Sequence, residues 1–188
     1  ITLSRHLQDI GLDAFYKTKY LNELHKRDGA FAECNHVLIG YDGDTAEVVV
    51  PDGIERIAAS FYQYNDPTVT PITSLVFPDS VTEMEAGVFY WCRDLKTVKL
   101  PGGIERVEKE MFSRCGQLGD MKVPEGVTSI GESAFYKCES MKRIELPESL
   151  TTIETEAFWW CVSLKTMELP SNVRKLGEGV FRACHGLK

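Results

Sequence analysis

Prolines recur along this 188-residue chain at a nearly constant interval, and the interval constrains the fold more than any other feature. Six prolines follow a hydrophobic residue, and successive ones are separated by 27, 23, 23, 23 and 23 residues. They are Pro51, Pro78, Pro101, Pro124, Pro147 and Pro170. Self-similarity at a fixed period of roughly 20–50 residues is typical of stacked repeat architectures. The sequence therefore predicts a solenoid of short coils.

Each repeat places the same kinds of residue at the same distances from its proline. The aromatic residues eleven positions after the proline are Tyr62, Phe89, Phe112, Phe135, Phe158 and Phe181, with Phe15 in an earlier unit. The residues fourteen positions after it are Asn65, Cys92, Cys115, Cys138, Cys161 and Cys184, with Thr18 in the earlier unit. One repeat cannot bury its apolar face alone, so we expect the aromatic column to stack into a spine.

A hydrophobic run of the form L-x-x-φ-x-φ precedes Pro101, Pro124, Pro147 and Pro170 and predicts a short strand. Its last two hydrophobic residues alternate with polar ones, so they point inward from the strand. Strands in consecutive coils can pair in parallel, and proline ends each strand because it has no N–H to donate to the ladder. A second hydrophobic pair, three and six positions after the proline, is expected on the opposite wall of the coil.

The whole chain, residues 1–188, is predicted to be one repeat domain. Residues 1–18 form a partial repeat with Ser4 in place of proline, and residues 51–188 form six repeats, of which the last is truncated. Residues 19–50 occupy the space of one repeat but carry a different pattern. Because both ends interrupt the motif, we expect the chain to be a fragment of a longer one.

The cysteines in the repeated position are predicted to be free thiols. Neighbouring strands lie about 4.8 Å apart, so distance alone does not exclude disulfides. However, Asn65 and Thr18 occupy the same position, which therefore requires a small hydrogen-bonding side chain. A 23-residue spacing without a C-x₂-C pair makes a column rather than a tetrahedral zinc site, so we expect no metal and no cofactor. Cys34 lies outside the column and is the candidate reactive thiol.

The repeat A-F-x-x-C-x-x-L-x-x-φ-x-φ-P-x-x-φ-x-x-I-x-x-x-A-F is nearly complete over residues 134–158. It resembles the 23-residue leucine-rich repeat of BspA-like surface proteins, also called the treponemal class, over residues 1–18 and 51–188. The irregular segment is similar to the β-hairpin that family members carry between repeats, with Asp42-Gly43 as its turn signal. A calcium loop at Asp42 and Asp44 is disfavoured because the third acidic position and the terminal Glu are missing.

The resemblance implies the fold class and the general function. The fold is a leucine-rich repeat solenoid of 23-residue units with a parallel β-sheet on its concave face and one β-hairpin insertion. The family implies a non-enzymatic protein, at the cell surface or secreted, in a host-associated organism, and several members look like adhesins for host matrix proteins. We therefore expect a host matrix or surface protein as the partner. The alternatives are a glycan or, for a passive spacer, no partner.

Composition and motifs exclude several other functions. A net charge of −7 and a pI near 5.2 leave no basic footprint for nucleic acid. No apolar run approaches the roughly 18 residues that span a membrane. The four histidines are scattered, and no nucleophile elbow, phosphate loop or metalloprotease motif is present. The chain is accordingly predicted not to be an enzyme.

The outward side chains of the strands form the first candidate binding surface. The residue two positions before each proline changes from Val to Lys to Glu along the repeats. The candidate residues are Lys99, Lys122, Arg143, Glu145 and Glu168. Alternatively, this face is a solvated sheet in which Lys122 and Glu145 form a cross-strand pair worth about 0.2–1 kcal/mol.

The residues just after the aromatic column form the second candidate surface. They are Tyr64, Tyr90, Trp91, Tyr136, Trp159 and Trp160, all expected on one edge of the coils. Aromatic groups and arginines on a surface are typical of binding hot spots. The alternatives are that these rings cover the gap between coils, or that they hold sugar rings. A further strip of glutamates precedes the aromatic column and is expected to be a solubilising face.

Overall fold

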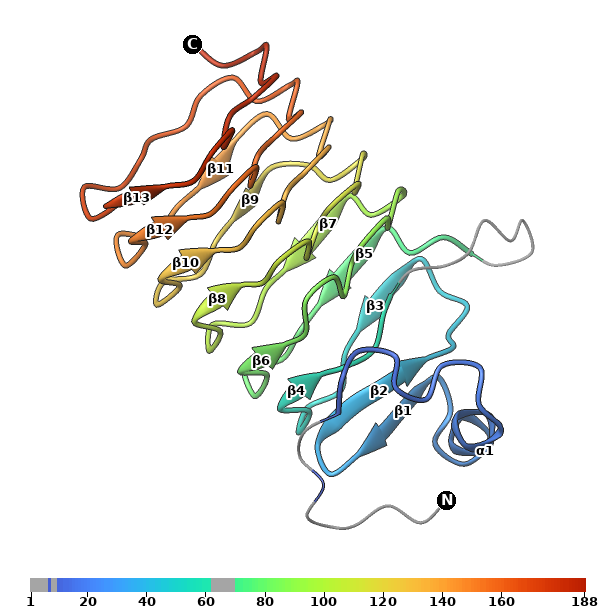
Figure 1. Cartoon of the computed structure of the whole chain (residues 1–188). Helices are drawn as coiled ribbons and strands as arrows, with labels where there is room; N and C mark the ends of the chain where they lie inside the picture. The colour runs from blue at the N-terminus through green and yellow to red at the C-terminus, as the bar shows by residue number, and fades with distance from the viewer. Residues whose placement is uncertain (1–6, 8–9, 62–69) are drawn as a thin grey trace.

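A computed structural model shows a solenoid of parallel coils and describes residues 7, 10–61 and 70–188 (Figure 1). Equivalent residues of neighbouring coils are 23 positions apart, so that Ile130 pairs with Val107 on one side and with Ile153 on the other. The predicted repeat solenoid is therefore confirmed. Three ladders of backbone hydrogen bonds run along it: two parallel sheets and one row of turns.

The first sheet contains the strands that precede the prolines. They are β3 (Glu47–Val49), β5 (Ser74–Val76), β7 (Thr97–Lys99), β9 (Met121–Lys122) and β11 (Ile144–Glu145). Hydrogen bonds join β3, β5 and β7 into one parallel group and β9 and β11 into another. Within β3, the side chain of Val48 is buried whereas that of Val49 is 66% exposed. This alternation is the one that the hydrophobic pattern predicts.

The second sheet forms the opposite wall, where the sequence predicts only a hydrophobic pair. Its strands are β4 (Arg56–Ile57), β6 (Glu83–Met84), β8 (Arg106–Val107), β10 (Ser129–Ile130), β12 (Thr152–Ile153) and β13 (Lys175–Leu176). Strands β8, β10, β12 and β13 form one parallel group, and β4 and β6 form another. The second hydrophobic residue of the pair is buried in the coils from Ile57 to Ile153, whereas Leu176 in the last coil is 50% exposed.

The aromatic spine forms the third ladder together with the turns around it. The rings of Phe112, Phe135 and Phe158 lie nearly parallel, with centroids 5.3 and 5.1 Å apart. Phe89 and Phe181 extend this stack at its two ends. The amides of Phe89, Phe112, Phe135 and Phe158 also donate to a carbonyl of the next coil, as from Phe112 to Ala134 at 2.7 Å. The predicted spine is thus confirmed from Phe89 onward.

The spine departs from its predicted course at its N-terminal end. The ring beside Phe89 is Phe61, with centroids 5.7 Å apart, and the contacts continue to Tyr41 and Phe31. Phe61 follows Ile57 by four residues, one fewer than in the equivalent turn from Met84 to Phe89, and this shifts the register. The predicted members Tyr62 and Asn65, and the predicted first position Ser4, lie outside the described residues.

A helix that the sequence analysis did not predict begins the irregular segment. Helix α1 (Lys19–Asp28) is capped by Thr18, whose Oγ1 accepts a hydrogen bond from the Leu21 amide at 3.2 Å. Phe15 packs against Tyr20 at 5.1 Å in a small separate cluster, so its predicted place in the spine is wrong. The cause is the helix, which starts immediately after Thr18 and turns the chain away from the spine.

The hairpin is present, but its turn is not the predicted one. Strands β1 (Phe31–Cys34) and β2 (Val37–Tyr41) pair antiparallel around Asn35 and His36, whose φ angles are 51° and 63°. Positive φ at both central residues is the geometry of the turns favoured in two-residue hairpins. Asp42-Gly43 instead follows β2, which also pairs in parallel with β4. The hairpin therefore extends the second sheet at its N-terminal end.

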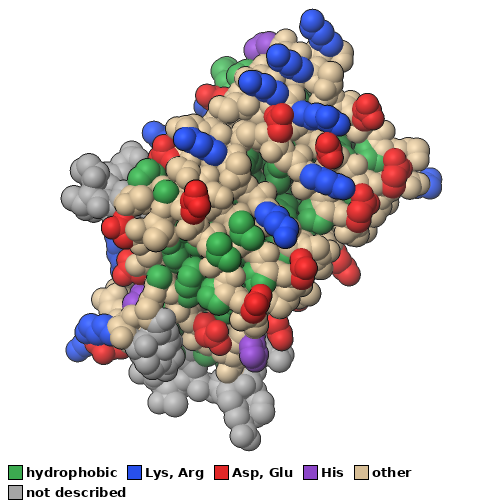
Figure 2. Space-filling model, turned by 180° about the vertical axis from the view of Figure 1, so that it is seen from behind, with side chains coloured by type: hydrophobic (Ala, Val, Ile, Leu, Met, Phe, Trp, Pro, Cys, Tyr) green, Lys and Arg blue, Asp and Glu red, His purple; other side chains and the backbone are tan. Residues whose placement is uncertain are grey.

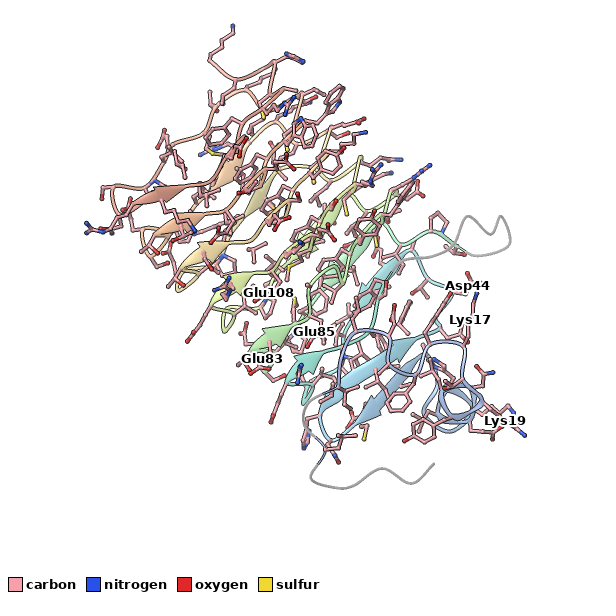
Figure 3. The ribbon with its side chains drawn as sticks, viewed as in Figure 1. Lys17, Lys19, Asp44, Glu83, Glu85 and Glu108 are labelled. Carbon is pink, nitrogen blue, oxygen red and sulfur yellow. The ribbon has the colours of Figure 1, made fainter. Side chains whose placement is uncertain are left out.

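Both sheets are interrupted between the coil of Phe89 and the coil of Phe112. No strand pairing joins β6 to β8 or β7 to β9 in the described part of the chain, and Figure 1 shows the wider spacing between β6 and β8. The turn ladder continues here, because the Phe89 amide donates to Met111 at 3.1 Å. A groove of about 660 Å³ lies over the interruption, and Figure 3 shows Glu83, Glu85 and Glu108 near it.

Candidate functional site

The turn after each spine residue has a left-handed backbone at one fixed position. The φ angles there are 63° at Trp91, 65° at Arg114, 58° at Lys137, 65° at Trp160 and 58° at Ala183. Non-glycine residues adopt this conformation infrequently, so its recurrence in successive coils is a property of the repeat. The residue lies between a spine residue and the buried or half-buried cysteine, and its side chain therefore forms one column along the solenoid.

The aromatic edge comprises the predicted residues Tyr90, Trp91, Tyr136, Trp159 and Trp160, and the structure brings them together along this row of turns. The rings of Tyr136 and Trp159 lie 5.0 Å apart, and those of Tyr90 and Trp91 lie 6.0 Å apart. Trp160 is 41% exposed and Tyr90 36%, whereas the other three rings are half-buried. The rings thus partly cover the gap between coils and partly face solvent. Tyr64 lies outside the described residues.

Basic side chains occupy the spaces between these rings. The guanidinium carbons of Arg93 and Arg114 lie 4.6 and 4.8 Å from the ring centroid of Trp91. The Nζ of Lys137 lies 5.5 Å from the Tyr136 ring and 5.6 Å from the Trp160 ring. These distances are in the range of cation–π attraction, about 0.5–1 kcal/mol for exposed pairs. The aromatic edge is therefore an alternating array of rings and cations.

These cations were not among the site residues predicted from the sequence. Arg114 and Lys137 occupy the same repeat position as Trp91 and Trp160, and this shared position is the signal that could have found them. Arg182 occupies the preceding position, like Trp159, and lies 5.1 Å from that ring. The contacts of Arg114 with Trp91, Lys137 with Trp160 and Arg182 with Trp159 join neighbouring coils, and stacking of the coils brings these side chains together.

Among the described residues, the cations of the aromatic edge have no acidic partners. In the described chain, none of Arg93, Arg114, Lys137 and Arg182 forms an ion pair. The glutamate strip that precedes the spine is different, because basic residues pair with several of its members. Lys109 lies 3.1 Å from Glu132, for example. Positive charge is therefore unneutralised on the aromatic edge, although the whole chain carries −7.

A shallow groove of about 410 Å³ lies within the aromatic edge. It is lined by Trp91, Arg93, Arg114, Gly116, Gln117, Lys137 and Glu139. Three cations and one carboxylate thus surround a small depression beside an indole ring. This arrangement can attract and hydrogen-bond an anionic group, because guanidinium N–H groups are strong donors to carboxylates.

The outward residues of the first sheet form a more neutral surface. Lys99, Lys122 and Glu168 are exposed as predicted, and Figure 2 shows basic and acidic side chains interspersed beside a hydrophobic area on the face seen from behind. Lys122 and Glu145 are partners in the strand register. Nevertheless, the ion pair of Glu145 is with Arg143, two residues earlier in the same coil, at 3.2 Å. The carboxylate of Glu145 therefore pairs locally rather than across the strands with Lys122.

The cysteines of the repeat are free thiols, as predicted. Cys115, Cys138, Cys161 and Cys184 each donate a hydrogen bond, at 3.0–3.2 Å, to the carbonyl oxygen of the spine phenylalanine of the preceding coil. Burial raises the pKa of Cys92 to about 12 and raises that of Cys138 well above its ordinary value. Thiols held in the protonated form are poor nucleophiles, so these cysteines have a structural role.

The described residues, 7, 10–61 and 70–188, carry neither a metal-binding cluster nor a membrane-spanning helix. No group of three His, Cys, Asp or Glu side chains is arranged to hold a metal ion. No helix there has both the length and the apolar character needed to cross a membrane.

Comparison with known proteins identifies the repeat. The model of the BspA type Leucine rich repeat region matches residues 60–188 with 6 copies. A search of curated proteins finds no match. A leucine-rich repeat protein from Bacteroides ovatus superposes with a TM-score of 0.65 and 27% identity, over 76% of this chain and 38% of its own. The Treponema pallidum leucine-rich repeat protein superposes with a TM-score of 0.60 and 25% identity. The match covers 81% of this chain and 82% of that protein.

A further structure, a leucine rich cell surface protein from Faecalibacterium prausnitzii, gives a TM-score of 0.58 at 24% identity and supports the fold alone. The match covers 81% of this chain and 48% of the Faecalibacterium protein. The chain thus spans less than half of the Bacteroides and Faecalibacterium structures. The family match covers most of the chain, and the structure builds its repeated positions into ladders. On these grounds the chain belongs to the BspA type leucine-rich repeat family.

Proposed function

We propose that the chain is a non-enzymatic, extracellular protein-binding scaffold, adhesin-like, that contacts host matrix or surface proteins through its aromatic edge. The observation that carries this proposal is the alternation of partly exposed rings with cations that lack acidic partners. Trp, Tyr and Arg are the residues most enriched in the energetic centres of protein interfaces. A stacked solenoid also presents such residues on a pre-organised surface, which lowers the entropic cost of binding.

The family supports the extracellular location. The resemblance is to surface proteins, and the Faecalibacterium structure with the same fold is described as a cell surface protein. Leucine-rich repeat solenoids are repeat scaffolds whose extended surfaces serve binding. The carboxylates of the described coils lie in exposed or half-exposed turns, many of them beside basic residues, which does not favour catalysis.

A glycan is the second candidate ligand, favoured by one observation. Trp160 and Tyr90 are the most exposed rings of the aromatic edge, and an exposed ring can stack on the apolar face of a sugar. The first-sheet residues Lys99, Lys122, Arg143, Glu145 and Glu168 remain the alternative protein-binding surface. A passive spacer would use neither surface.

Biolayer interferometry of the soluble chain on immobilised fibrinogen, fibronectin and mucin tests these functions. Saturable binding to fibrinogen or fibronectin, lost in Trp91→Ala and retained in Lys122→Gln, supports the proposed function and its site. The reverse pattern moves the site to the first sheet. Mucin binding that free sugar blocks favours the glycan. Binding to none of the three proteins contradicts the matrix-adhesin proposal.

A further inference from the structure

We propose that the aromatic edge recognises an acidic segment of its partner protein, with the partner's carboxylates bound at Arg93, Arg114 and Lys137. This inference rests on the proposed protein-binding function and deepens it by naming the chemistry of the partner. It goes beyond the aromatic hot spot because it assigns the cations, rather than the rings, as the groups that select the ligand.

The rings hold the cations in place for such a ligand. Trp91 lies against two guanidinium groups, Arg93 at 4.6 Å and Arg114 at 4.8 Å. A guanidinium stacked on an indole keeps its N–H edge free, and that edge matches the two oxygens of a carboxylate. Lys137 adds a third positive charge from the next coil, positioned between Tyr136 and Trp160. These contacts order the long side chains in the free protein, and this lowers the conformational-entropy cost of binding.

The charge distribution favours an anionic partner at this edge. The groove brings three cations together with one carboxylate, Glu139, in a chain whose net charge is −7. Several basic residues elsewhere are paired with glutamates, as Arg106 is with Glu108 and Lys175 with Glu154. An unneutralised basic groove on an acidic protein steers acidic ligands toward one place and rejects basic ones.

The same geometry favours a protein segment over a glycan. Arg93 and Arg114 both lie against the Trp91 ring, so that ring offers less free face for stacking on a sugar. Glu139 at the groove repels a densely sulfated chain more than it repels separated carboxylates. The groove, of about 410 Å³, is also small and receives a few side chains rather than a long polymer.

The chain contains a built-in reporter for this binding. All three of its tryptophans, Trp91, Trp159 and Trp160, lie in the aromatic edge, so the intrinsic fluorescence of the protein reports on the proposed site. The probe is an end-capped peptide of alternating Glu and Gly, and the matched control peptide replaces Glu with Gln. We expect a saturable fluorescence change with the Glu peptide, weaker at physiological than at low salt, and no change with the Gln peptide.

Charge-removing variants test which residues select the peptide. The double variant Arg114→Gln with Lys137→Gln is expected to lose about tenfold in affinity for the Glu peptide. Arg114 and Lys137 both have a positive φ angle, so their substitution also changes a residue in the left-handed region. Arg93 does not have a positive φ, and Arg93→Gln therefore provides a second variant without this complication. The matched control is Lys109→Gln with Arg174→Gln, which removes the same charge away from the edge and should leave the affinity within about twofold.

Four outcomes overturn the inference. The first is a Glu peptide that causes no saturable change at low salt. The second is equal loss of affinity in the edge and control variants. The third is a heparin oligosaccharide that produces the fluorescence change when the Glu peptide does not. Fibrinogen or fibronectin binding that survives in Arg114→Gln with Lys137→Gln also overturns it, while leaving the protein-binding function intact.

Discussion

The thiol of Cys138 donates a hydrogen bond to the carbonyl oxygen of Phe112, 3.2 Å away in the preceding coil. The same oxygen accepts the amide of Cys115 at 3.1 Å within its own turn. The thiols of Cys115, Cys138, Cys161 and Cys184 therefore each link their coil to the preceding one by a hydrogen bond, next to the stacked rings. This contact explains why the position takes Cys repeatedly: the slot needs a small, buried side chain that can also donate.

Replacing Cys138 separates these two requirements. Cys138→Ala removes the donor and some volume, and we expect it to reduce the free energy of unfolding by about 1–2 kcal/mol, from the lost hydrogen bond and the small cavity. Cys138→Ser keeps a donor and should lose less. Denaturant titration of the two variants measures both values. If Ser is worse than Ala, the slot selects an apolar side chain and the hydrogen bond is incidental.

The buried thiols predict a loss of stability at alkaline pH. In the unfolded chain a thiol ionises near its ordinary pKa of 9.0, whereas burial raises the pKa of Cys92 to about 12. The folded state thus holds the proton more tightly, so Cys92 leaves stability unchanged below pH 9. Above pH 9 it lowers the free energy of unfolding by about 1.4 kcal/mol per pH unit, up to about pH 12.

Denaturant titration across this pH range, compared between the wild type and Cys92→Ser, measures the thiol's share of the alkaline loss. The decline should be shallower in the variant; an unchanged slope would contradict the assignment. A thiol reagent at neutral pH provides a second check. Cys34 and Cys184, which are half-buried, should react before Cys92, Cys115, Cys138 and Cys161, which should react only on unfolding.

Sequence periodicity was sufficient for the spine and the inward strand positions because each depends on the residue's place in its own repeat. It failed where the repeat is absent. Residues 19–50 carry no period, and the stronger local signal of Asp42-Gly43 outweighed Asn35-His36, which forms the actual turn. Helix α1 could have been found from Thr18 and Gly29, which cap its two ends.

The candidate site was only half predictable. The predicted aromatic residues that the structure describes lie along one row of turns, because they share two repeat positions. The cations were not predicted, because the contact of Arg114 with Trp91 joins residues 23 positions apart. That contact depends on the conformations that two long side chains adopt between coils. Sequence spacing places such residues in one column but does not show which ring a guanidinium covers.

Close coil packing predicts that replacing Gly131 is destabilising. A Cβ added at Gly131 would lie 2.5 Å from the backbone nitrogen of Lys109 and 2.8 Å from the carbonyl carbon of Glu108. We expect Gly131→Ala to cost about 1–3 kcal/mol, as overpacking does, because backbone atoms cannot move aside. Gly116→Ala is the matched control, since its Cβ would meet nothing within 4 Å. Thermal unfolding of both variants measures the difference, and we expect a lower midpoint for Gly131→Ala. Equal midpoints would mean that neighbouring coils can move apart at little cost.

Truncation of the spine tests the core. Phe135 is fully buried, with Phe112 at 5.3 Å and Phe158 at 5.1 Å on its two sides. Phe135→Ala should therefore cost about 3–5 kcal/mol, the range for large core truncations. The exposed Tyr16→Ala provides the comparison and should cost far less. A loss below about 1 kcal/mol for Phe135→Ala in denaturant titration would show that the stacked rings contribute little to stability.

The interruption between β6 and β8 predicts a local weakness in the solenoid. The amide of Glu108 has no hydrogen-bond acceptor among the described residues, whereas the equivalent amide of Glu154 donates to Ile130 at 2.9 Å. Amide hydrogen exchange followed by NMR should therefore be faster at Glu108 than at Glu154. Gly131, whose amide donates to Val107 at 2.8 Å, should behave like Glu154. Protection of Glu108 equal to that of Glu154 would mean that the second sheet is continuous in solution and that the groove over the interruption closes.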